Sequence, residues 1–176
     1  REVMVGGEPM STLKVNRIEP RSGDTVEIVG FNSGGVIQTV LGTCSEFMTT
    51  NTDAYVPTGL EATITPTKAS SKILVTWNIQ VSVANANGFG VALSRNGQEV
   101  WRNKYNGAMY VTGISDIYLY QGPYIFMDEP NTTNPLNYKS LVSEHYAPSG
   151  PLKLNGYGDE EQYEVETQIL LQEIAV

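Results

Sequence analysis

The sequence predicts an all-β protein, a jelly-roll-like β-sandwich preceded by a short N-terminal β-strand segment. Apolar residues occupy every second position from Ile73 to Val83, which is the period of a strand with one buried face. The chain has 17 glycines and 9 prolines, and they separate short runs with strand-like alternation. Many short strands between regular turn signals are typical of sandwiches and barrels. No long helical pattern appears.

The chain divides into residues 1–34 and residues 35–176. The first part has too little apolar sequence to fold alone, since an isolated pair of strands is marginal in water. We expect it to attach the protein to a partner and to associate with copies of itself. The residues expected to do so are Leu13, Val15, Ile18, Val26 and Ile28. The glycine-rich stretch 31–35 is a flexible joint.

The first half of the larger part contains three predicted strands. Residues 36–41 form the first, and the polar residues 42–58 are a turn-rich connection. Residues 60–64 alternate between apolar and polar and form the second strand, whose ladder ends at Pro66. The third is the long strand that begins at Ile73.

Residues 91–102 predict a β-hairpin. Asn96 and Gly97 lie between two apolar-containing runs, which favours a two-residue type I′ turn. Such a turn pairs Arg95 with Gln98, Leu93 with Val100, and Ala92 with Trp101. Leu93 then faces the core and Trp101 the opposite side of the sheet.

Three further strands complete the prediction. They cover residues 114–127, 136–146 and 163–171, with loops at 128–135 and 147–158. The last strand is apolar on one face and, through Leu170 and Ile174, partly apolar on the other. A strand with two apolar faces lies in the middle of a sandwich or at a subunit contact.

Composition argues against several classes of partner. The 19 acidic and 11 basic residues give a net charge of −8, whereas nucleic-acid binding needs clustered Lys and Arg. No stretch approaches the roughly 18 apolar residues that a membrane span requires. Cys44 is the only cysteine, so neither an intrachain disulfide nor a cysteine-rich zinc site can form.

The sequence also offers no catalytic constellation, and we expect a non-enzymatic protein without cofactors or metals. Ser143, Glu144 and His145 are adjacent, but neighbouring strand residues point to opposite faces and cannot form one relay. The acidic run 159–161 lacks the spacing of a calcium loop and is more simply a solvated turn.

Aromatic residues are concentrated in the middle of the chain. Tyrosine suits sugar or protein recognition because it joins a flat apolar ring to a polar tip; packing within the sheets is the simpler alternative. The residues are Trp101, Tyr105, Tyr110, Tyr118, Tyr120 and Tyr124. We expect Tyr105 and Tyr110 to be exposed at a loop tip as a receptor site, and Tyr118 and Tyr120 to belong to a sheet.

Residues 58–75, TGLEATITPTKASSKILV, resemble a signature of bacteriophage tail-fibre and related virion proteins. Residues 10–20, 35–40, 93–97 and 169–175 are similar to further segments of that family and occur in the same order. The resemblance covers most of the chain, but it is weak over residues 103–160.

The resemblance implies a virion structural protein on the surface of a tail or capsid, usually a homotrimer and often a fibre or knob. Its implied partners are other virion proteins and a host-surface glycan or protein. A head-decoration or head-fibre protein that stabilises the capsid is an alternative. A carbohydrate-binding module or glycan hydrolase fragment is another; it would require a pair of carboxylates, drawn from Asp116, Asp128 or Glu129, in a concave groove.

Overall fold

The computed structural model describes residues 35–84, 88–103, 109–110, 117–144, 150–156 and 165–176. The predicted attachment residues Leu13, Val15, Ile18, Val26 and Ile28 lie outside the described residues, as does Tyr105. The described residues form strands and no helix. The strands are β1 (Val36–Cys44), β2 (Met48–Thr50), β3 (Val56–Ile64), β4 (Lys72–Ala84), β5 (Gly88–Arg95), β6 (Gln98–Arg102), β7 (Met109–Tyr110), β8 (Ile117–Asp128), β9 (Leu136–Glu144), β10 (Leu152–Leu154) and β11 (Thr167–Ile174).

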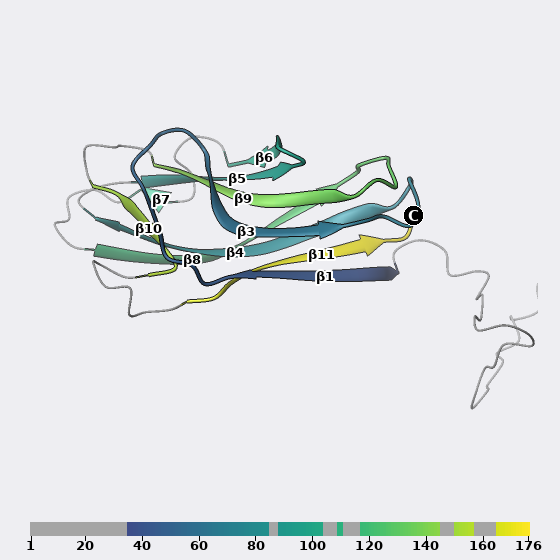
Figure 1. The fold of residues 1–176 in the computed structure, drawn as a ribbon, viewed down its shortest axis with the longest axis horizontal. Helices are drawn as coiled ribbons and strands as arrows, with labels where there is room; N and C mark the ends of the chain where they lie inside the picture. The colour runs from purple at the N-terminus through teal and green to yellow at the C-terminus, as the bar shows by residue number, and fades with distance from the viewer. Residues whose placement is uncertain (1–34, 85–87, 104–108, 111–116, 145–149, 157–164) are drawn as a thin grey trace, which may run out of the picture. The chain divides into compact units, whose positions relative to one another are not determined.

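Two antiparallel sheets form a sandwich (Figure 1). The first sheet has the order β1-β11-β4-β8, and β10 and β2 extend it beyond the end of β11. The second has the order β3-β9-β5-β6, with β7 paired to β5. Apart from the β5–β6 hairpin, each connection between the long strands crosses from one sheet to the other. This connectivity is that of a jelly roll, and it confirms the predicted fold class.

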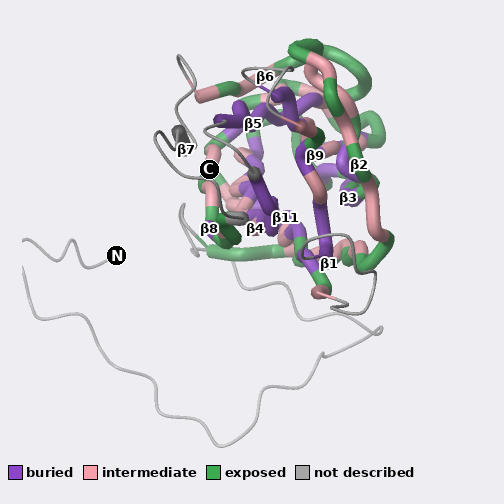
Figure 2. Tube along the Cα trace, turned by 90° about the vertical axis from the view of Figure 1, so that its left-hand side faces the viewer, coloured by how far each residue is buried: buried purple, intermediate pink, exposed green. Residues whose placement is uncertain are grey.

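The core lies between the two sheets, where Figure 2 shows the buried stretches. The alternating residues of β4 from Ile73 to Val83 are all buried, at 2% exposure or less, so the predicted register of this strand is confirmed. Its other face is half-buried rather than wet, and Gln80 and Ser82 on that face are buried.

The family-like segment has a clear structural role. Gly59 adopts a φ of +84° at an irregularity in the pairing of β3 with β9. Glycine reaches this conformation without steric cost. Beyond it, Leu60, Ala62 and Ile64 are buried while Glu61 and Thr63 are exposed, as the alternation predicts.

The β5–β6 hairpin combines a confirmed turn with an incorrect register. Asn96 and Gly97 have φ values of 50° and 81°, as a type I′ turn requires, and Arg95 pairs with Gln98. A bulge between Leu93 and Ser94 then shifts the pairing, so that Leu93 opposes Trp101 and Ala92 opposes Arg102. The predicted pairs of Leu93 with Val100 and of Ala92 with Trp101 are wrong.

Other strand boundaries differ from the prediction in places. β1 continues to Cys44, and β2 and the start of β3 lie in the expected connection 42–58. β10 lies in the expected loop 147–158. β8, β9 and the loop between them agree with the prediction, and β11 lies between β1 and β4, in the middle of the first sheet.

The β3–β4 loop closes around a buried carboxylate. Glu173 Oε1 accepts hydrogen bonds from the Thr67 amide and hydroxyl, both at 2.8 Å, and from the Lys68 amide at 3.4 Å. Glu173 Oε2 accepts one from Gln38 Nε2 at 3.2 Å. Burial alone opposes ionisation, but these hydrogen bonds outweigh it and hold the pKa of Glu173 below its ordinary value. The Ser71 hydroxyl adds to this effect by proximity, although its geometry falls outside a hydrogen bond.

We therefore expect Glu173→Gln to lower the free energy of unfolding at pH 7 by about 1–3 kcal/mol, since charge-assisted hydrogen bonds become neutral ones. A depressed folded-state pKa stabilises the protein above the unfolded-state value near 4.5. That contribution is lost as the pH falls through the folded pKa. Urea titrations from pH 7 to pH 3 should show the difference between wild type and variant shrinking on acidification. Glu166→Gln, at an exposed carboxylate, is the control, and a difference that stays constant with pH would contradict the prediction.

Candidate interaction surface

The outer face of the first sheet is an ordered grid of outward-facing side chains. Strand pairing places them in three rows across β1, β11, β4 and β8. The rows are Thr39, Gln172, Leu74 and Met127; Leu41, Leu170, Thr76 and Ile125; and Thr43, Gln168, Asn78 and Pro123. We call these residues the uncharged face.

The uncharged face exposes large apolar side chains that no described residue covers. Ile125, Leu41 and Met127 are 67%, 56% and 45% exposed. Charges lie at its rim, where Lys72 Nζ pairs with Glu129 Oε1 at 2.6 Å and Glu166 Oε1 accepts a hydrogen bond from Gln168 Nε2 at 2.9 Å. Four strands about 4.8 Å apart and three rows about 6.7 Å apart give the face an area on the order of 400 Å². Six of its twelve side chains are apolar, and the other six are polar and uncharged.

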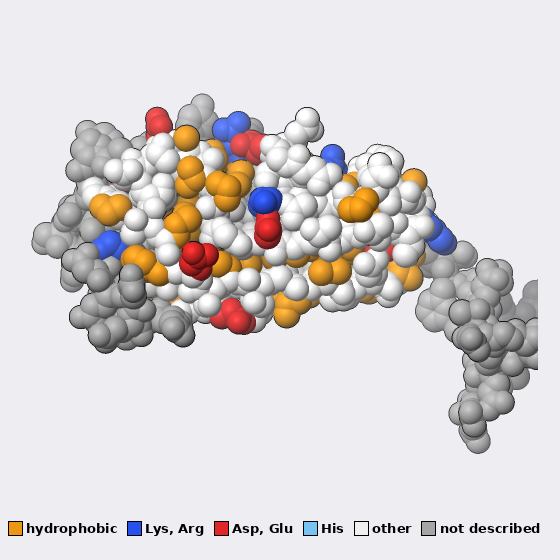
Figure 3. All heavy atoms as spheres, in the orientation of Figure 1, with side chains coloured by type: hydrophobic (Ala, Val, Ile, Leu, Met, Phe, Trp, Pro, Cys, Tyr) orange, Lys and Arg blue, Asp and Glu red, His pale blue; other side chains and the backbone are white. Residues whose placement is uncertain are grey.

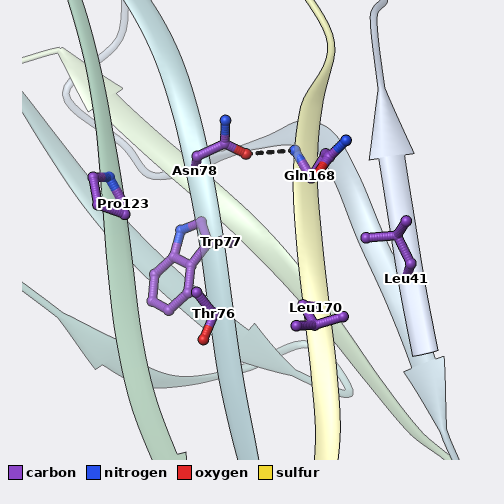
Figure 4. A pocket seen from close by; sticks show the side chains of 7 residues that line it. All are labelled: Leu41, Thr76, Trp77, Asn78, Pro123, Gln168 and Leu170. Carbon is purple, nitrogen blue, oxygen red and sulfur yellow. Dashed lines mark hydrogen bonds between the residues drawn. The ribbon is translucent and has the colours of Figure 1, made fainter. Parts of the chain in front are cut away.

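A hollow of about 280 Å³ lies in the middle of the face. Figure 4 shows Leu41 and Leu170 to one side of it and Pro123 to the other. Asn78 Oδ1 accepts a hydrogen bond from the Gln168 amide at 2.6 Å, at the point where β4 changes partner from β11 to β10. The hollow lies between apolar side chains of the sheet and has room for an apolar side chain.

The outer face of the second sheet is different in kind. It carries ion pairs between Lys139 and Glu61 at 2.5 Å and between Arg102 and Glu99 at 2.6 Å, and Figure 3 shows a basic side chain against an acidic one over β9 and β3. Tyr55 covers part of this face, because a Cβ added at Gly90 would meet its hydroxyl. Its ion pairs are typical of a face in contact with solvent, and Tyr55 already packs over part of it. The outer face of the first sheet is therefore the candidate interaction surface.

The aromatic residues of the middle region belong mostly to the interior. Trp101 lies edge-on to Trp77 with ring centroids 5.4 Å apart, and Tyr124 stacks on Trp77 at 5.4 Å. Tyr120 contacts Phe89 at 5.3 Å. The packing alternative is therefore the correct one for these three aromatic residues.

The two tyrosines proposed as a receptor site are not brought together by described contacts. Tyr110 belongs to β7 and pairs with Gly88, but its side chain is not described, and Tyr105 lies outside the described residues. Tyr118, expected to be a sheet residue, lies in β8 and is 37% exposed.

The described part of the chain does not bring the candidate catalytic and metal-binding residues of the sequence together. No three His, Cys, Asp or Glu side chains there could hold a metal ion, and the candidates Asp116 and His145 lie outside it. Asp128 is buried and bound to Arg95 and Tyr138, and Glu129 is paired with Lys72, so neither lines a groove as part of a carboxylate pair. Cys44 is half-buried and receives a weak hydrogen bond from Asn155 Nδ2 at 3.7 Å. No helix of the described residues has the length and apolarity to cross a membrane.

The uncharged face was not predicted, although a signal for it exists in the sequence. The outward positions of β4, β8 and β11 contain no Asp, Glu, Lys or Arg over the three rows. Ordinary outer faces carry such residues, as the second sheet does. The apolar second face of the last strand, noted from Leu170, was one part of this signal.

Comparisons with known proteins concern the fold alone. No family model matches the chain, and no curated protein matches it. The infectious bursal disease virus VP2 subviral particle is similar at 9% identity and a TM-score of 0.37, over 86% of this chain and 44% of that one. A dimeric latent PorU from Porphyromonas gingivalis is similar at 13% identity and a TM-score of 0.35, over 82% of this chain and 14% of that one. This chain therefore spans less than half the length of either, and similarity at this level identifies neither a family nor a function.

Proposed function

We propose that the chain is a structural subunit of a bacteriophage virion, a trimeric fibre or knob whose sandwiches pack against one another through the uncharged face. The observation that carries the proposal is the absence of charge from that face in a chain of net charge −8. Copies of one strongly acidic chain repel each other. They associate most readily through a surface where no like charges meet and apolar area is removed from water.

The shape of the face suits a closed ring. Leu41 and Leu170, beside the hollow, belong to β1 and β11, whereas the protruding Ile125 belongs to β8 at the opposite edge of the sheet. Around a three-fold axis, the β8 side of one copy meets the β1 side of the next. This contact is heterologous, and it closes because each copy offers both halves. It also covers the outer edges of β1 and β8, which have no strand partner among the described residues.

The virion assignment is supported by the family-like signature in residues 58–75 and by a jelly roll in which that signature forms the β3–β4 unit. In this proposal residues 1–34 attach the subunit to other virion proteins. The sandwich is displayed on the particle and binds a host-surface glycan or protein. The roles of Tyr105 and Tyr110 in that binding stay predictions from the sequence.

Light scattering with size exclusion tests the assembly. The wild type is expected at about three times the monomer mass of 19.3 kDa. Ile125→Asp and Leu41→Asp place a carboxylate in the contact, and burying an unpaired charge there costs several kcal/mol, so both should give monomers. Thr63→Asp, at an exposed position on the outer face of β3, is the matched control and should leave the trimer intact. Circular dichroism should show that the monomeric variants keep the wild-type fold.

A monomeric wild type at micromolar concentration would contradict the trimer. If such a monomer binds particles lacking the protein, and Ile125→Asp abolishes that binding, the face contacts the capsid and the chain is a head-decoration protein. Hydrolysis of a glycan by the purified chain would favour the glycan hydrolase alternative instead.

A further inference from the structure

A second recess lies at one end of the sandwich, between the β5–β6 turn and the β8–β9 loop. It has a volume of about 390 Å³, within the roughly 300–1,000 Å³ range of small-molecule sites. Its walls carry the polar side chains of Arg95, Gln98, Thr132 and Asn134. Pro130 contributes apolar surface, whereas Leu136 borders the recess but is only 2% exposed. Its lining is more polar than that of the hollow in the uncharged face, and it shares no residue with that face.

The frame of this recess is held by local hydrogen bonds. The Asn96 amide donates to the Asn137 carbonyl at 2.8 Å, and the Asn137 amide donates to Asn96 Oδ1 at 2.8 Å. Asn96 Nδ2 reaches the Pro135 carbonyl at 3.3 Å, which ties the turn to the loop. The Asn134 amide donates to Thr132 Oγ1 at 3.1 Å. Fixed walls lower the entropic cost of binding a ligand.

The donors and acceptors that remain are uncharged or neutralised. Among the described residues, the side-chain amides of Gln98 and Asn134 have no hydrogen-bond partner and are exposed. Arg95 Nη1 is bound to Asp128 Oδ2 at 2.7 Å, so the guanidinium charge is balanced while its other N–H groups stay available as donors. A recess with paired amide donors and acceptors and no net charge favours a neutral hydroxylated ligand over an anion.

We propose that this recess binds a neutral sugar residue, whose hydroxyls bond to Gln98, Asn134 and Arg95 and whose apolar ring face lies against Pro130. The proposed function includes binding to the host surface, and this inference names the site and the class of ligand for that binding. It rests on that function only for its biological meaning, because sugar binding and trimer assembly are measured separately on the purified protein.

Saturation-transfer NMR with methyl glycosides of glucose, galactose, mannose and N-acetylglucosamine tests the proposal on the full chain. At least one is expected to bind saturably, with a dissociation constant in the millimolar range that is ordinary for one sugar unit held by a few hydrogen bonds. Gln98→Ala and Asn134→Ala should each weaken that binding about tenfold, the equivalent of one good hydrogen-bonded contact. Gln121→Ala, an exposed amide on β8 outside the recess, should leave it unchanged.

Three results would overturn the assignment. One is that none of the four glycosides binds saturably at about 50 mM, a concentration that would fill most of the recess even at a dissociation constant of ~10 mM. Another is equal weakening by Gln121→Ala and Gln98→Ala, which would indicate non-specific contact. The third is tighter binding of sulfate or phosphate than of any sugar, which would make the recess an anion site. Each is independent of whether the chain is a trimer.

Discussion

Replacement of Trp77 by alanine is expected to lower the free energy of unfolding by about 3–5 kcal/mol, the range for removing a large buried aromatic side chain. Trp77 is 1% exposed and lies at the centre of the core, between Trp101 and Tyr124 with ring centroids 5.4 Å away in both cases. The substitution removes both ring contacts and leaves a cavity that the two rigid sheets cannot close. The denaturant midpoint measures the loss, provided the slope of the transition is unchanged.

Two further variants separate the loss of ring packing at Trp77 from the loss of its indole N–H and from changes on the outer face of β4. Trp77→Phe keeps an apolar ring and removes an indole N–H that has no hydrogen-bond partner among the described residues, so it should cost under about 1.5 kcal/mol. Thr76→Ala, on the half-buried outer face, should cost under about 1 kcal/mol. Equal losses for Trp77→Ala and Thr76→Ala would show that the two faces of β4 are assigned wrongly. Asn78→Ala should fall between them at about 1–2 kcal/mol, because its side chain caps the start of β11.

The second large effect is expected at Asp128, which joins the two sheets. Asp128 Oδ2 accepts hydrogen bonds from Arg95 Nη1 at 2.7 Å and from the Tyr138 hydroxyl at 2.6 Å. Burial, reinforced by the hydrogen bond to Asp128, raises the pKa of Tyr138 above its usual range. Asp128→Ala leaves the Tyr138 hydroxyl buried without its acceptor and Arg95 without its counter-charge. The Arg95 side chain is 27% exposed, so water offsets part of the loss, and we expect a cost of about 2–4 kcal/mol.

Two controls accompany this change. Asp128→Asn keeps an acceptor oxygen and should lose about half as much stability. Glu129→Ala removes the adjacent acid, whose ion pair with Lys72 is exposed, and should cost no more than about 0.5 kcal/mol. A loss at Glu129 as large as that at Asp128 would show that the net charge of this end of the sandwich, and not the buried contact, is responsible.

The features that the sequence predicted well are those set by local chemistry. Alternation fixed the faces of β4 because one side of the strand has to be apolar to be buried. The Asn96–Gly97 turn was predictable because few residue pairs adopt positive φ twice in succession. Each of these signals is contained in a handful of neighbouring residues.

The errors arise where a non-local contact decides the outcome. A bulge between Leu93 and Ser94 has no sequence signature here, yet it turns Trp101 from the predicted outer face to the inner face, where it packs against the core. Leu152 and Leu154 form a strand only because β2 and β4 offer edges on both sides. The polar recess likewise depends on Arg95 and Asn134 meeting across sequence-distant segments, and no spacing rule predicts that.

The pairing of β1 with β11 has a consequence for how the chain folds. Val36, in the first strand of the sandwich, lies opposite Ile174 in the last, and the β1 strand has no other strand partner among the described residues. During synthesis the pairing of β1 with β11 therefore forms only after nearly the whole sandwich has left the ribosome. Folding that waits for such a long loop to close is slow and prone to aggregation. Expression at lower temperature, or with a holding chaperone, should raise the yield of soluble protein more than substitutions on its surface do.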